Sequence, residues 1–306
     1  MKFYLFTLII ITILFSSCGK GIVQVSNESY EPRIVVEGIL LPHHQVSKIR
    51  ITKNFPIDKN LNYYSLIFNP NRTDVTITDE QTGRIYPLEL NIPEDNILEN
   101  YYYEYNGSDL IIDYGKSYTL EVRTTDNGNE LYTKSTTTIP EEGFYIQNIN
   151  FDNLLYRARD ENDDLINFQI TINRSPGTTF YRTSVKSSDA STETFIYDNP
   201  FTEVDAQDVQ DDINAYMYNY NWIMDTPETP GTSLFSLYWI NFWFYGEYQI
   251  IVYAADKNYE YFLETYNDVM EDDGNFHEAR FSFEGDGIGV FGSAIADTVY
   301  VTVSED

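Results

Sequence analysis

Cysteine is the residue that this sequence most nearly lacks. Of its 306 residues only Cys18 is a cysteine, so no disulfide bond can form within one molecule. The thiol of Cys18 is therefore available for a modification other than an intramolecular disulfide. Its position, directly after an apolar N-terminal run, indicates which modification that is.

Basic residues are also scarce. The chain has 19 Lys and Arg against 48 Asp and Glu, a formal net charge of −29. So acidic a surface repels nucleic-acid phosphates and anionic lipid headgroups, which excludes nucleic acid as a partner. Acidic side chains can also hold divalent cations, and Asp160–Asp164 begins like a calcium loop. Leu165 and Thr171 stand where an EF-hand has its turn glycine and its bidentate glutamate, so we predict a solvated loop and leave calcium binding open.

Signatures of catalysis are missing as well. The sequence has no Gly-x-Ser-x-Gly nucleophile elbow and no His-Glu-x-x-His zinc motif. His43 and His44 are neighbours, which point to opposite sides of an extended chain, and His277 has no second ligand at metal-site spacing. We therefore predict a protein that is not an enzyme and has no cofactor.

The N-terminus carries an export signal. Lys2 precedes an apolar run from Phe3 to Phe15, which only Thr7 and Thr12 interrupt. A membrane-spanning helix needs about 20 apolar residues, so this shorter run is typical of a secretory signal peptide.

The end of that signal resembles a lipobox, the site cut by lipoprotein signal peptidase. Phe15-Ser16-Ser17-Cys18-Gly19 has a large apolar residue, two small residues and then the cysteine. Residues 1–17 are then the signal peptide, and Cys18 becomes the lipidated first residue of the mature chain. Two or three acyl chains hold a protein on a membrane far more firmly than one, because each buried CH₂ contributes about 0.8 kcal/mol. Membrane attachment through Cys18 should be permanent.

Beyond a tether at residues 18–30, the composition indicates a mainly β protein. Aromatic residues make up 16% of the chain, and its 27 tyrosines alternate with Thr, Ile and Val, as in half-buried strands. Seven short strand patterns between residues 34 and 139 predict an immunoglobulin- or transthyretin-like β-sandwich over 31–140. Two hairpins are expected there, around Asp79–Gly83 and around Asp126-Asn127-Gly128.

The sequence pattern predicts a second region over residues 144–306, an antiparallel β-sheet with one packed helix. Leu165–Asn173 and Thr179–Lys186 are expected to pair, and the irregular stretch after them to form loops up to Gly231. Leu234–Tyr245 is apolar at successive positions, which favours the central strand of the sheet.

The helix is expected over 256–270. Five residues fall at helical spacing behind Asp256, which can cap the helix start: Tyr259, Phe262, Leu263, Tyr266 and Met270. The ordinary explanation of this stripe is core packing, and a cofactor site is the alternative.

The order of these segments resembles one family, the Bacteroidota lipoproteins catalogued as domain of unknown function 4249. The resemblance rests on the lipobox and on six further segments: Ile34–Gly38, Asp74–Glu80, Gly115–Leu120, Tyr132–Pro140, Tyr261–Leu263 and Gly289–Gly292. Such families are often encoded beside TonB-dependent transporters, which implies an outer-membrane lipoprotein that assists uptake. In these lipoproteins export to the cell surface often follows an acidic cluster after the cysteine. Here the tether begins Gly19-Lys20-Gly21, so the periplasmic and surface faces both remain open.

Two further patterns have alternative interpretations. Gly287-Ile288-Gly289-Val290-Phe291-Gly292 matches the dinucleotide fingerprint, which requires a helix after it. Asp297–Val303 alternates like a strand instead, so we expect a glycine-rich turn before the last strand. Two aromatic clusters, at Tyr101–Tyr103 and Tyr216–Trp222, either cover their own core or are exposed, where they could stack on sugars or form a protein interface. The alternative function is a surface glycan-binding lipoprotein whose rings stack on sugars, with Tyr216, Tyr218, Tyr220 and Trp222 as the candidate residues.

Overall fold

A computed structural model describes residues 30–55, 63–92, 101–200, 203–223, 226–270 and 279–305. The chain from Pro32 to Asp306 forms one compact unit. No helix among the described residues is both long and apolar enough to cross a membrane. The predicted signal peptide, Cys18 and most of the tether lie outside the described residues.

One layer of the first half is a five-stranded antiparallel sheet. Its strands, in spatial order, are β16 (Glu284–Gly285), β8 (Asn129–Thr138), β7 (Ser117–Asp126), β3 (Asp74–Asp79) and β4 (Arg84–Pro87). Both predicted hairpins are confirmed: β3 pairs with β4, and β7 with β8. In the second hairpin Asn127 and Gly128 have φ angles of 50° and 87°, the two positive values that a tight two-residue turn requires.

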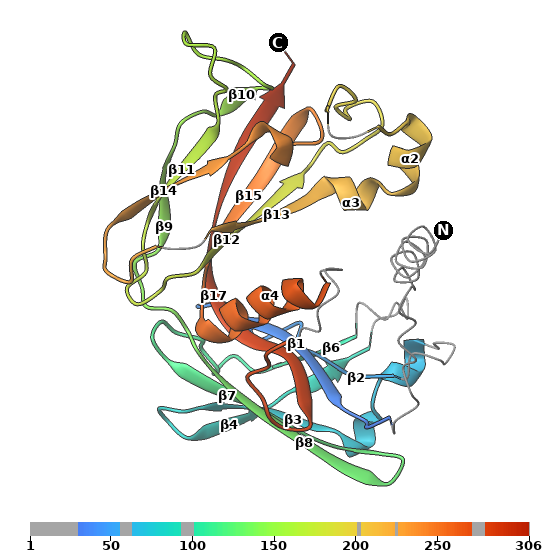
Figure 1. The fold of residues 1–306 in the computed structure, drawn as a ribbon. Coiled ribbons are helices and arrows are strands. Elements are labelled where there is room, and N and C mark those ends of the chain that lie inside the picture. Colours follow the sequence, from blue (N-terminus) through green and yellow to red (C-terminus); the bar gives the residue numbers. More distant parts are fainter. Residues whose placement is uncertain are drawn as a thin grey trace, which may run out of the picture. The chain divides into compact units, whose positions relative to one another are not determined.

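A seven-stranded sheet faces it and continues into the second half of the chain (Figure 1). Its main path runs β13 (Tyr218–Ile223), β12 (Tyr181–Ser187), β15 (Gly246–Ala255), β17 (Gly287–Ser304), β1 (Ile34–Leu40) and β2 (Arg50–Lys53), with β10 (Asn153–Leu155) also paired to β17. The first residues of β17 pair in parallel with β1, and the later ones pair antiparallel with β15. One strand thus belongs to both halves.

Smaller sheets complete the β structure. A three-stranded sheet contains β14 (Thr232–Leu237), β11 (Phe168–Asn173) and β9 (Tyr145–Ile149), and a two-stranded one contains β5 (Glu89–Asn91) and β6 (Tyr102–Glu104). Short 3-10 turns lie at Tyr63–Leu66, Pro70–Arg72 and Trp239–Asn241.

Among the described residues, two large hydrophobic clusters lie between these layers, and a third, small one of Phe180, Ala255 and Leu263 lies at α4. One gathers buried residues from Ile34 to Ile139, and the other gathers residues from Phe144 to Val303. The exception is Phe291 of β17, which is fully buried in the first cluster. The prediction of a mainly β chain with a β-sandwich and a packed helix is confirmed. The division into domains 31–140 and 144–306 stays a prediction, since the halves share β17 within one compact unit.

Two local expectations for the second half were wrong. β11 and β12 do not pair with each other but belong to different sheets. The reason is that Ile170 of β11 and Val185 of β12 pack into the same hydrophobic core, which lies between these two sheets. The expected central strand at 234–245 ends at Leu237, where Asn241 Oδ1 accepts the Tyr238 N–H and closes a 3-10 turn. The aromatic side chains after this turn fill the core, and β15 takes the central position instead.

The longest helix in the described part of the chain is α4 (Lys257–Met270), at the predicted position. Two short helices, α2 (Ala206–Asp211) and α3 (Ile213–Met217), occupy part of the stretch expected to form loops. Asp205 caps α2, and its side chain accepts the N–H groups of Gln207 and Asp208. An Asp at this position was the available sequence signal for a helix start.

The glycine-rich segment lies inside β17 and not in a turn before it. Gly287, Gly289 and Gly292 are in register with Ile34, Val36 and Ile39 of β1. At Gly292 a Cβ atom would come within 3.0 Å of the Tyr259 Cβ and 2.9 Å of Asp256 Oδ1. The absence of a side chain therefore allows the start of α4 to contact the strand directly.

Candidate functional site

Asp256 fixes the start of α4 to both halves of the protein. Its Oδ1 accepts the backbone N–H of Tyr259 at 3.1 Å and that of Ser293 in β17 at 2.9 Å. Its Oδ2 accepts the hydroxyl of Thr137 in β8 at 2.7 Å. Burial raises the pKa of the Asp256 carboxyl, and these hydrogen bonds oppose that rise only in part. One carboxylate thus joins a helix and two strands.

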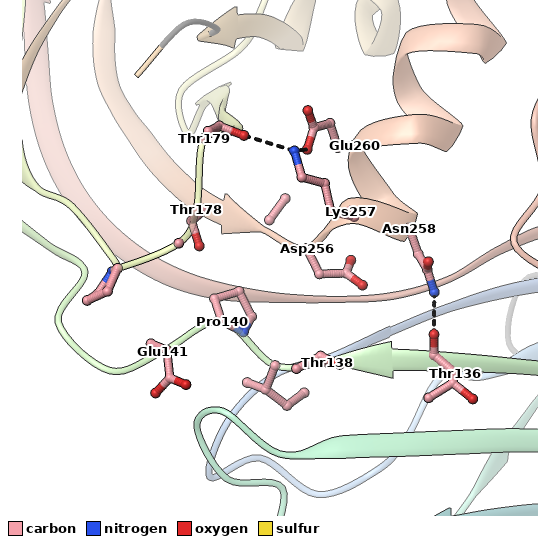
Figure 2. A pocket seen from close by; sticks show the side chains of 14 residues that line it. Thr136, Thr138, Pro140, Glu141, Thr178, Thr179, Asp256, Lys257, Asn258 and Glu260 are labelled. Atoms are coloured by element: carbon pink, nitrogen blue, oxygen red, sulfur yellow. Dashed lines mark hydrogen bonds and ion pairs between the residues drawn. The ribbon is translucent and has the colours of Figure 1, made fainter. Parts of the chain in front are cut away.

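A polar pocket of about 350 Å³ opens beside this junction (Figure 2). Lys257 Nζ lies 2.8 Å from Glu260 Oε2 and 3.1 Å from Thr179 Oγ1. Asn258 Nδ2 donates to the carbonyl oxygens of Thr136 and Phe291, at 2.7 and 2.9 Å. Lys257, Asn258 and Glu260 are thus engaged in bonds within the protein, which favours a structural role for this end of α4.

A larger and more apolar hollow of about 1080 Å³ lies along the other side of α4. We call it the α4 groove. Its walls come from β1, β17 and α4, together with Tyr253 and Arg182 of the neighbouring strands, and include Val35, Ile39, Val290, Phe262 and Tyr266. The aromatic stripe of α4 therefore lines an open space as well as packing on the sheet. Among Tyr259, Phe262, Leu263 and Tyr266, only Leu263 is buried.

Arg182 supplies the positive charge of the α4 groove. Its Nη1 donates to the Tyr259 hydroxyl at 2.5 Å, and its guanidinium carbon lies 5.8 Å from the Tyr259 ring centroid. Glu37 also borders the groove, but its Oε2 lies 2.7 Å from Arg50 Nη1. The groove thus has mainly apolar walls, with one basic and one acidic side chain, Arg182 and Glu37, in its lining.

The structure describes the candidate glycan-stacking residues only in part. Tyr216 is half-buried and packs on Phe195 and Trp243, with ring centroids 5.2 and 5.5 Å apart. Tyr218 is 39% exposed, and Lys186 Nζ lies 5.3 Å from its ring centroid. The side chains of Tyr220 and Trp222 lie outside the described residues, although their backbone belongs to the edge strand β13. Glycan stacking by this cluster stays a prediction.

Other sequence candidates have structural explanations. Tyr103 of the Tyr101–Tyr103 cluster is 4% exposed and belongs to the first core. The His43 ring packs edge-on against Tyr114, and His277 lies outside the described residues. In the acidic loop Asp160 Oδ1 accepts two backbone N–H groups, and this lowers the pKa of its carboxyl. In the described part of the chain, no three His, Cys, Asp or Glu side chains gather as they would around a metal ion.

The sequence interpretation missed the α4 groove, although a signal was present. In β1, Ile34, Val36 and Leu40 are buried in the first core, and the intervening Val35 and Ile39 are also apolar. A strand that is apolar on both faces indicates that something covers both. No comparable signal marked Arg182, because its position in the groove depends on strands that are distant in the sequence.

Comparison with known proteins gives a family but no function. The profile of the family described as "Domain of unknown function (DUF4249)" matches residues 22–284. No curated protein matches the chain.

Among solved structures, similar chains have low TM-scores. A tetra-tandem repeat in the extending region of a large adhesion protein has a TM-score of 0.23 at 12% identity, over 89% of this chain and 49% of that one. A two-domain fibronectin type-III segment from chicken tenascin has 0.21 at 13%, over 74% and 91%. A bacterial ice-binding adhesin has 0.22 at 11%, over 90% and 65%. The chain thus spans about half the length of the first and under two thirds of the third, and no functional argument rests on this level of similarity.

Proposed function

The chain belongs to the DUF4249 family, and we propose that it is a lipid-anchored, non-catalytic protein of the outer membrane that assists a TonB-dependent uptake system. One observation carries the proposal: the only cysteine follows an apolar signal and two small residues, as in a lipobox. In the sequence, β1 begins at Ile34, shortly after the predicted tether of residues 18–30. The acidic composition, with its net charge of −29, suits a protein that must stay soluble close to a crowded membrane.

The anchor is tested by replacing its cysteine. The expected result is that the wild-type chain incorporates labelled palmitate and sediments with membranes, whereas Cys18→Ala does neither. Ser26→Ala in the same tether is the matched control and should behave as wild type. Incorporation of label that is indifferent to the Cys18→Ala change would disprove anchoring at this residue.

The accessory role is tested by isolating the anchored protein from mildly solubilised membranes. The proposal requires that a TonB-dependent transporter is recovered with it in a fixed ratio. Recovery of the lipoprotein alone, under conditions that keep other envelope complexes intact, would contradict this role while leaving the anchor intact.

The alternative role in glycan binding is favoured by the position and partial exposure of one ring. Tyr218 is 39% exposed on the edge strand β13, and Tyr220 and Trp222 follow it at alternate positions. Glycan-array binding that is lost in Trp222→Ala but kept in Tyr300→Ala, a change at an exposed tyrosine of another strand, would support this role. Binding that survives Trp222→Ala would remove the cluster as a site.

A further inference from the structure

We propose that two copies of this chain associate through β14, by pairing their β14 strands antiparallel into one continuous sheet. β14 (Thr232–Leu237) is an edge strand, because among the described residues it pairs with β11 and with no strand on its other side. An exposed edge is a template for pairing with another chain. The pairing requires neither the anchor at Cys18 nor a transporter, so its failure would leave the function proposed above standing.

The outer edge of β14 offers backbone groups for this pairing. The Arg174 N–H donates to the Gly231 carbonyl, so residues 174 and 231 form a hydrogen-bonded pair at the end of the β11–β14 ladder. Hydrogen-bonded and non-hydrogen-bonded pairs alternate along an antiparallel ladder. The N–H and C=O groups of Leu234 and Ser236 therefore point away from β11, and in the described part of the chain no hydrogen bond uses them.

This free window is closed at both ends by bonds within the chain. Thr232 also has its backbone groups on the outer edge, but its carbonyl oxygen accepts a hydrogen bond from Arg174 Nη1. At the other end the Tyr238 N–H donates to Asn241 Oδ1 at 2.8 Å. The free groups thus belong to the two residues that flank Phe235.

That arrangement is self-complementary. When two β14 strands pair antiparallel with the two-fold axis between their Phe235 residues, Leu234 of one copy lies opposite Ser236 of the other, and the reverse. Each of these pairs exchanges both N–H···O=C bonds of an antiparallel ladder. The same surface is then used on both partners, as in most homodimers.

Exposed apolar side chains lie along the same edge. Phe235 and Leu237 point into the second core. By contrast, Leu234 is 59% exposed, and Tyr238, directly after the strand, is 56% exposed. In the two-fold register Leu234 lies diagonally across from its own copy and from Tyr238 of the other copy, at a spacing of roughly 7–8 Å that long side chains can bridge. Pairing therefore removes these apolar surfaces from water.

The absence of charge favours a second copy as the partner. The chain has a net charge of −29, so two copies repel each other over most of their surfaces. The strands β9, β11 and β14 contain no Asp, Glu, Lys or Arg, although these residues make up 22% of the chain. This sheet is thus a place where two such acidic molecules can meet without bringing like charges together.

Two other sheet edges show the usual protection against pairing. The β2 end of the seven-stranded sheet is covered by β6, with backbone hydrogen bonds in both directions between Ile49 and Tyr103. β4, at the end of the five-stranded sheet, carries the charge of Arg84 and has Pro87, which lacks an N–H. β14 has neither a charge nor a proline.

The test is sedimentation equilibrium of the mature chain carrying Cys18→Ser, which has neither a lipid nor a thiol to join two copies. Because the free window is short, we expect a weak, reversible monomer–dimer equilibrium with a dissociation constant of about 10 μM to 1 mM.

Charged substitutions at Leu234 assign the dimer to the β14 edge. Leu234→Lys and Leu234→Glu should each weaken association at least roughly tenfold, because like charges then lie diagonally across the two-fold axis. An equal mixture of the two variants should associate more tightly than either alone, since opposite charges then meet. Ile85→Lys, at a side chain 62% exposed on the edge strand β4, is the matched control and should leave association unchanged.

Ser236→Pro tests the backbone bonds without a change of charge. The Ser236 N–H points away from β11, so a proline there leaves the ladder within the chain complete and removes a donor only from the proposed pairing. Association should again weaken at least roughly tenfold. Thermal unfolding of each variant establishes that it is folded.

Three results would overturn the proposal. One is a wild-type sequence at β14 that stays monomeric up to the highest concentration of the expected range. Another is a dimer that Leu234→Lys and Ser236→Pro leave intact, because the copies would then meet elsewhere. The third is a mixture of Leu234→Lys and Leu234→Glu that associates no better than either variant alone.

Discussion

At the residue scale, the side chain that most constrains the junction around α4 is Asp256. It is a carboxyl whose pKa is raised by burial, in contrast to the exposed acids Asp109 and Asp113, whose pKa values are lowered chiefly by hydrogen bonds from Tyr105 and Lys116. A raised pKa means that the folded state binds this proton more tightly than the unfolded chain does. Asp256 therefore contributes stability that is present below its unfolded pKa, about 3.8, and is lost as the pH rises through the folded pKa.

Asp256→Asn isolates this effect, because asparagine can still cap α4 and accept the Ser293 N–H. We expect the free energy of unfolding of the variant, relative to wild type, to increase as the pH rises from below 3.8 toward neutrality. Urea denaturation of both proteins across that pH range measures the difference between their free energies of unfolding. The contributions of the titratable groups that both proteins share cancel in this difference. A difference that falls as the pH rises would show that the charged carboxylate is the favoured form and would contradict the prediction.

At the element scale, buried tyrosine hydroxyls hold strand starts to the segments before them. Tyr118 of β7 is fully buried, and its hydroxyl donates to the Ile111 carbonyl at 2.8 Å and accepts the Asp113 N–H at 3.0 Å. Tyr181 of β12 accepts the Ser175 N–H at 2.9 Å in the same way. This arrangement is similar to the tyrosine corner of immunoglobulin-like sandwiches.

Tyr118→Phe removes only the hydroxyl and leaves the Asp113 N–H without its partner. We expect a loss of about 1–3 kcal/mol in the free energy of unfolding, the usual cost of an unsatisfied buried group. Tyr300→Phe is the matched control, because Tyr300 is 55% exposed and should change stability by less than about 0.5 kcal/mol. Equal stabilities of the two variants in urea denaturation would rule out this role for the Tyr118 hydroxyl.

Some elements of this fold could be predicted from the sequence and others could not. The Asn127-Gly128 hairpin and the capped stripe of α4 were predictable, because turn geometry and helical spacing are set by neighbouring residues. The parallel pairing of β1 with β17 was not, since it joins segments about 250 residues apart, and local patterns carry no information on such a partner. The α4 groove depends on this pairing, so its polar end at Arg182 could not be foreseen.

At the scale of the whole molecule, β17 makes the two halves depend on each other. Its first part carries Phe291 into the first core, and its later part carries Ile295 and Val301 into the second. The two cores should therefore unfold together.

Phe291→Ala tests this coupling. We expect it to lower the free energy of unfolding by about 3–5 kcal/mol, the typical cost of removing a buried ring. The three tryptophans, Trp222, Trp239 and Trp243, all lie in the second half of the sequence, so their fluorescence reports on the half that does not contain the Phe291 core. The fluorescence midpoint should fall together with the circular dichroism midpoint. A fluorescence transition that stays at the wild-type midpoint would mean that the halves unfold independently.

The most direct test of the proposed function is mass spectrometry of the N-terminal peptide of the protein purified from its native membranes. The account predicts a peptide that begins at Cys18 and carries a diacylglyceryl thioether on that residue. A mature chain that begins at any other residue, or that begins at Cys18 with a free thiol, would contradict it.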